Sequence, residues 1–85
     1  MTYETHNLRA VSAERSNSVI IYHATGIGET FNISVEKYVG KRLVECSFVK
    51  GVRGSLQEID ALMLEFSIGG LEPCHLRDVI NDLYS

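Results

Sequence analysis

The chain has 85 residues and a formal net charge of −3, and 45% of its residues are hydrophobic. These values predict one domain with one core and leave no room for a second domain of ordinary size. The acidic balance argues against general nucleic-acid binding, which needs a basic excess to neutralise phosphates. No secretory signal and no bilayer-spanning apolar run is visible, so we expect a cytoplasmic protein that does not enter a membrane.

The N-terminal residues 1–17 are polar and weakly patterned, so we expect a partly ordered segment ahead of a domain over residues 18–85. The scattered apolar residues of this segment are compatible with a short strand or with no fixed structure; they are Leu8, Ala10, Val11 and Ala13. Because so small a chain buries only a modest part of its surface, self-association would add stability, and we expect a homo-oligomer.

Two strands are predicted in the next part of the chain. Residues 18–23 form a β-branched and aromatic run typical of a strand, and Gly26 and Gly28 indicate a turn over residues 24–28. Residues 30–36 alternate between apolar and polar side chains. This period of two predicts an antiparallel strand that has one solvent-facing side.

A third strand is predicted over residues 42–49, where the side chains alternate again. Val44, Cys46 and Phe48 form the more apolar of the two alternating sets, so we expect this set to face the core. The alternative is an aromatic surface on or beside the sheet, formed by Tyr22, Tyr38 and Phe48, that stacks a base or packs against another subunit. The three runs together predict an antiparallel meander.

Two helices follow the strands. Ser55 and Glu58 have the spacing of a capping box, and apolar residues then recur at helical spacing until Gly69 and Gly70 end the pattern. Pro73 suits the first turn of a second helix. Strands followed by helices indicate an α+β fold. The expected architecture is a three-stranded antiparallel sheet with both helices packed on one face.

The segment between the third strand and the first helix is the strongest candidate for a binding site. It brings two glycines, two cations and a hydroxyl to the start of a helix, where unpaired backbone N–H groups favour negative charge. The candidate ligand-binding residues are Lys50, Gly51, Arg53, Gly54 and Ser55. A simple tight turn with solvated cations is the alternative interpretation of the same residues.

Other motifs indicate little chemistry. Gly26-Ile27-Gly28 lacks the third glycine and the helix of a dinucleotide-binding motif, so a turn is the better interpretation. Cys74 and His75 are adjacent rather than spaced like paired metal ligands, and we predict no metal or cofactor. No acid–base pair or nucleophile constellation can be assembled, so we predict that the chain is not an enzyme.

The order and spacing of several short motifs resemble a known family. They are residues 26–31 (GIGETF), 40–46 (GKRLVEC), 51–55 (GVRGS) and 68–73 (IGGLEP). In this order they resemble the TSCPD-type domain, found at the C-terminus of adenosylcobalamin-dependent ribonucleotide reductases and as small stand-alone proteins. The resemblance implies an α+β architecture and an association with nucleotide chemistry.

The chain departs from that family at its cysteines. Ile27 stands where the first motif of the family usually carries a cysteine, and Gly54 and Ser55 stand where another is frequent. The metal binding suggested for the family is therefore not implied for this chain.

These observations support two hypotheses about function. The first is a small non-enzymatic module that binds or sequesters a phosphorylated small molecule or nucleotide through residues 50–55. The second is a protein-interaction module that docks on or inhibits an enzyme through its helix pair or an open sheet edge.

Overall fold

The computed structural model describes residues 5–12, 17–27 and 29–84. In chain order its elements are β1 (Thr5–Val11), β2 (Ser18–Ile27), β3 (Thr30–Val39), β4 (Arg42–Arg53), α1 (Leu56–Gly69), a 3-10 turn (Pro73–His75) and α2 (Leu76–Tyr84). The predicted α+β class is confirmed. The sheet, however, is antiparallel with four strands in the order β1-β2-β3-β4, and the prediction of three strands was wrong.

The additional strand is β1, in a stretch whose sequence predicts only partial order. It pairs antiparallel with β2 so that Leu8 lies opposite Ala24 and Ala10 lies opposite Tyr22. Leu8 and Ala10 pack against the core. In the described part of β1, only these two residues pack against the core, so the apolar alternation of the strand is short and its sequence pattern is weak. Ala13 lies outside the described residues.

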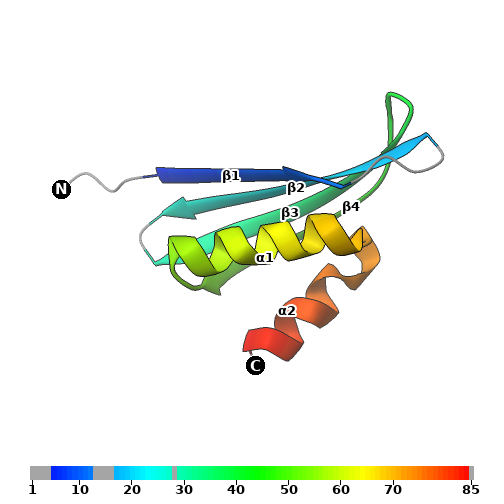
Figure 1. Cartoon of the computed structure of the whole chain (residues 1–85). Coiled ribbons are helices and arrows are strands. Elements are labelled where there is room, and N and C mark those ends of the chain that lie inside the picture. Colours follow the sequence, from blue (N-terminus) through cyan, green and yellow to red (C-terminus); the bar gives the residue numbers. More distant parts are fainter. Residues whose placement is uncertain (1–4, 13–16, 28, 85) are drawn as a thin grey trace.

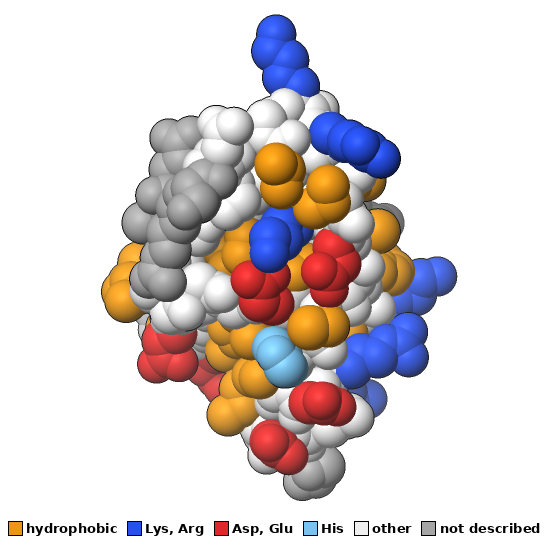
Figure 2. All heavy atoms as spheres, turned by 90° about the vertical axis from the view of Figure 1, so that its right-hand side faces the viewer, with side chains coloured by type: hydrophobic (Ala, Val, Ile, Leu, Met, Phe, Trp, Pro, Cys, Tyr) orange, Lys and Arg blue, Asp and Glu red, His pale blue; other side chains and the backbone are white. Residues whose placement is uncertain are grey.

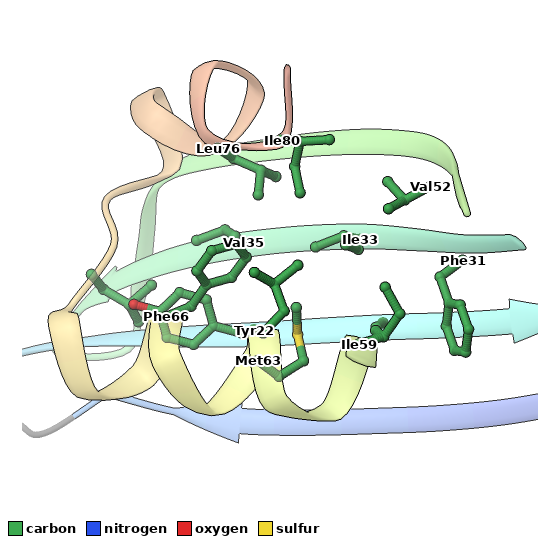
Figure 3. Packing of buried hydrophobic residues seen from close by; sticks show 13 residues of the cluster. Tyr22, Phe31, Ile33, Val35, Val52, Ile59, Met63, Phe66, Leu76 and Ile80 are labelled. Carbon is green, nitrogen blue, oxygen red and sulfur yellow. The ribbon is translucent and has the colours of Figure 1, made fainter. Parts of the chain in front are cut away.

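Both helices cover the same face of the sheet, as Figure 1 shows. The alternating side chains of β2 and β3 point towards α1, whose apolar stripe closes the core (Figure 3). Thirteen buried hydrophobic residues form one cluster: Ile20, Tyr22, Ala24, Phe31, Ile33, Val35, Val52, Ile59, Leu62, Met63, Phe66, Leu76 and Ile80. We call this side of the sheet the covered face and the other side the open face.

The two ends of α1 form as the sequence predicts. The Ser55 hydroxyl accepts from the backbone N–H of Glu58, and the Glu58 carboxylate accepts from the N–H of Ser55. Gly70 ends the helix in the left-handed conformation with φ of 64°, which glycine adopts without a Cβ penalty. These caps fix where α1 starts and where the chain turns towards α2.

The connection between the helices is tied to the sheet at two points. The Tyr22 hydroxyl donates to the carbonyl oxygen of Leu71 at 2.9 Å. Lys37 Nζ lies 3.0 Å from a carboxylate oxygen of Glu72. With Leu76 and Ile80 of α2 buried in the core, these contacts hold α2 beside β4.

The prediction for the faces of β4 was wrong. Val44, Cys46 and Phe48 are exposed on the open face, opposite to the expected orientation. The register shows why, because Val35 and Ile33 of the covered face lie opposite Ser47 and Val49. β4 is an edge strand and its turn with β3 extends beyond the helices (Figure 1), so apolar residues there are only partly covered.

No helix in the described part of the chain is long and apolar enough to cross a bilayer.

Candidate ligand-binding site

The segment 50–55 is mostly strand rather than loop. β4 continues as far as Arg53, and a register shift opposite Asn32 marks a β-bulge. Gly51 has φ of 71° there, a conformation that is cheap for glycine and strained for other residues. Gly51 therefore allows the backbone to form the bulge. Only Gly54 and Ser55 connect the strand to α1.

The backbone N–H groups of this segment already have partners within the protein. Gly51 donates to Asn32 Oδ1 at 3.1 Å, and Gly54 donates to the carbonyl oxygen of Glu29 at 3.4 Å. Ser55 donates to Glu58 Oε1 at 3.2 Å. The Glu58 carboxylate also brings negative charge to the start of α1. These three amides are thus already hydrogen-bonded to acceptors of the protein itself, so they do not form a binding site for an anion.

The cations of the segment line a depression between the edge strand β4 and the helix α2. Two adjoining hollows of about 390 and 360 Å³ make up this depression. We call it the β4–α2 trough. It is lined by Phe48, Val49, Lys50, Gly51, Val52 and Arg53 from β4 and by Arg77, Ile80 and Asn81 from α2.

Helix α2 supplies polar groups to the trough because Arg77 and Asn81 are one helical turn apart and share a face. Together with Lys50 and Arg53 they give three cations and one amide, and no carboxylate is among the lining residues described. Figure 2 shows Lys and Arg side chains gathered along the right-hand margin, from mid-height downwards. In a chain of net negative charge, this trough is a locally positive surface.

An aromatic ring borders the trough. Phe48 is 44% exposed, and Lys50 Nζ lies 5.7 Å from its ring centroid, within the range of a cation–π contact. Phe48 and Arg77 also line a hollow of about 570 Å³ that begins on the open face of the sheet. The open face and the trough therefore meet at these two side chains.

The predicted site residues are only partly brought together. Lys50, Gly51 and Arg53 line the trough, whereas Gly54 and Ser55 are not among its lining residues. Gly54 instead lies against Ile59, where an added Cβ would be 3.3 Å from Cδ1 of that side chain. Of the predicted residues, the two cations and the bulge glycine remain candidates for ligand binding.

Two lining residues, Arg77 and Asn81, were missed by sequence reasoning. Their i, i+4 spacing indicated a shared helix face, but its meaning depends on α2 lying beside β4. Phe48 was expected in the core because of its apolar character, with a surface position for its ring as the alternative. Each miss follows from the position of β4 at the sheet edge, which the sequence does not reveal.

Other reactive side chains lie apart from one another. Cys46 and Cys74 are free and exposed. Among the residues that the structure describes, no three His, Cys, Asp or Glu side chains gather closely enough to hold a metal ion.

On the open face, Glu36 Oε2 accepts from the Tyr38 hydroxyl at 3.2 Å. Desolvation and then this carboxylate raise the pKa of Tyr38 above its ordinary value.

The chain matches no protein-family model, and no curated protein or solved structure shows significant similarity to it. The resemblance to the TSCPD-type domain therefore stays a prediction.

Proposed function

We propose that this chain is a small binding module that holds a phosphorylated small molecule, such as a nucleotide, in the β4–α2 trough. The observation that carries the proposal is the convergence of Lys50, Arg53 and Arg77 on one depression without a lining carboxylate. Cations placed together in a concave site favour phosphate, and a guanidinium can bind two phosphate oxygens at once. The trough has the size of ordinary small-ligand sites.

Binding without catalysis fits the lining of the trough. Its residues supply cations, an amide and apolar surface, but they include no hydroxyl, thiol, imidazole or carboxylate. General acid–base and nucleophilic chemistry mostly use such groups, and the one other candidate in the lining is the amine of Lys50, which is exposed. We therefore propose a role in sequestering or sensing its ligand rather than in converting it.

Thermal unfolding with a panel of phosphorylated compounds tests this proposal. The panel contains inorganic phosphate, pyrophosphate and nucleoside mono-, di- and triphosphates. A compound present at 100 times its Kd is expected to stabilise the chain by roughly 2.7 kcal/mol. Higher salt should reduce the effect, because screening weakens charge interactions at a surface.

Charge-matched variants locate the site. Arg77→Ala should remove most of the ligand-dependent stabilisation, because Arg77 lines the trough together with Lys50. Lys41→Ala is the control, since Lys41 is an exposed cation in the β3–β4 turn and changes the net charge equally. Equal losses in both variants, or no stabilisation by any compound in the panel, would refute the proposal.

A second candidate function is docking to another protein, including a second copy of this chain. The observation that favours it is the set of exposed apolar side chains at and near one end of the open face: Val11, Leu43, Val44 and Phe48, which are 44–48% exposed. Apolar surface of this kind is typical of contact regions. Sedimentation of the chain over a range of concentrations, with Leu43→Glu as the variant, tests self-association.

A further inference from the structure

A second depression adjoins the trough around the edge of β4. This hollow of about 570 Å³ is lined by Ser34, Glu36, Cys46, Ser47, Phe48 and Arg77. We call it the open-face recess. Phe48 and Arg77 line both the recess and the trough. One ligand can therefore occupy both, with one end on the open face and the other beside α2.

The recess and the trough differ in charge. The recess contains the Glu36 carboxylate, whereas the trough contains Lys50 and Arg53 and has no carboxylate among its lining residues. A phosphate would be repelled by Glu36 and attracted by the cations. This asymmetry orients a nucleotide with its phosphates in the trough and its base in the recess.

Phe48 offers a surface on which a base can stack. The residue is 44% exposed, and Lys50 Nζ lies 5.7 Å from its ring centroid. Cys46 is two residues away on the same face of β4, and Ser34 lies opposite Phe48 on β3. The floor beside the ring is thus made of small side chains, which leave space for a flat heterocycle.

The Glu36 carboxylate would discriminate between bases. Its carboxylate accepts one bond from Tyr38, at 3.2 Å, and lies 3.8 Å from His23 Nε2. An ionised carboxylate has about four acceptor positions and no donor, so positions remain for a ligand. Guanine presents two neighbouring donors, its ring N1–H and its amino group. Adenine presents an acceptor at the same ring nitrogen, which a carboxylate disfavours.

The distance along β4 indicates a ligand with a phosphate chain. Cys46 in the recess and Lys50 in the trough are four positions apart along β4, which corresponds to about 13 Å of strand. A free phosphate is too short for this span, whereas a base, a ribose and two phosphates cover it. We infer that the ligand is a guanine nucleotide, with its base against Phe48 and Glu36 and its phosphates at Lys50, Arg53 and Arg77; this inference rests on the proposed function.

Isothermal titration of the full chain with GDP, ADP and pyrophosphate tests the inference. GDP is expected to bind about tenfold more tightly than ADP, and pyrophosphate more weakly than either, because it cannot occupy the recess. Phe48→Ala should weaken GDP binding about fivefold, the lower end of the effect of one base–aromatic stack. It should weaken pyrophosphate binding less, because Phe48 affects the phosphate end only through its contact with Lys50. A cooperative thermal unfolding transition shows that the variant is folded.

Glu36→Gln separates base recognition from stacking. Because glutamine presents a donor as well as an acceptor, the preference for GDP over ADP should fall to about threefold or less. Leu64→Ala, an exposed apolar truncation on α1 that lines neither depression, is the control and should leave all three affinities unchanged.

The outcomes distinguish the inference from the proposed function. Equal binding of GDP and ADP that Phe48→Ala does not weaken would overturn the guanine inference and leave phosphate binding in the trough intact. Absence of binding by all three compounds would overturn both. A GDP preference that survives Glu36→Gln in full would also contradict the inference, because the carboxylate would then not select the base.

Discussion

The covered and open faces of the sheet come from the same strands but have opposite characters. On the covered face, Tyr22, Ile33 and Val35 are 0% exposed and pack against the helices. On the open face, the neighbours His23, Ser34 and Glu36 are only partly buried. The alternation of a strand thus separates a face that stabilises the fold from a face that is free to bind.

The difference in burial between the two faces is clear on the inner strands β2 and β3 and smaller on the edge strand β4. There the residues on the covered side include Glu45 and Ser47, while Phe48 points to the open side. An edge strand contributes less to the core, so its inward positions tolerate polar residues and its outward positions can carry binding groups. The proposed site lies at the strand where the alternation is least regular.

The largest expected difference between the faces is in their tolerance of truncation. Ile33→Ala removes a fully buried side chain and should lower the free energy of unfolding by about 2–5 kcal/mol. Phe48→Ala on the open face should lower it by less than about 1 kcal/mol, although more atoms are removed. Urea unfolding measures both. Similar losses would mean that the open face is also part of the core.

A glycine on the covered face provides a second test. An added Cβ at Gly26 would lie 2.3 Å from Cε1 of Phe31, so Gly26→Ala should destabilise the chain by about 1–3 kcal/mol through overpacking. Gly69→Ala is the matched control, since nothing lies within 4 Å of its Cβ position. That change should be neutral or stabilise α1 by up to about 1 kcal/mol. Thermal unfolding of both variants tests whether the Phe31 ring fills the space beside Gly26.

The smallest expected effect concerns Tyr22, whose hydroxyl donates to Leu71. Tyr22→Phe should lower the free energy of unfolding by about 1 kcal/mol at neutral pH. Burial and then Glu72 raise the pKa of Tyr22 from 10.0 to about 12. The folded chain therefore holds this proton more tightly than the unfolded chain, and the resulting stability is present below pH 10 and lost as the pH rises towards 12.

Unfolding by urea at a series of pH values between 9 and 12 checks the tyrosine prediction. The difference between the two proteins isolates Tyr22 from the lysines that titrate in the same range. The wild type should lose its advantage over Tyr22→Phe across this window. A constant difference would show that burial does not perturb this hydroxyl.

The sequence predicted the elements whose signals are local. The capping box at Ser55, the end of α1 at Gly70 and the alternation of β3 depend on neighbouring residues alone, and all three are present in the structure. For β1 a strand was only one of the interpretations left open, because its contribution depends on pairing with β2. The orientation of β4 was missed because it depends on which strand lies at the sheet edge.

The candidate site was predictable only in part for a related reason. Lys50 and Arg53 stand in a conspicuous cluster, and the structure places them in the trough. Their partners Arg77 and Asn81 are more than twenty residues away in sequence and come from α2. The pairing of Gly51 with Asn32 across the bulge is equally nonlocal, so the sequence could not show that the amides were already used.

The exposed position of β4 has a consequence for solubility. An unpaired edge strand is a template on which another chain can add, and natural proteins counter this with bulges and with lysine at the edge. β4 has two register irregularities and carries Lys50 and Arg53 near one end and Arg42 at the other. Replacing these cations by apolar residues would therefore be expected to promote fibrous aggregation, even where the folded domain itself remained stable.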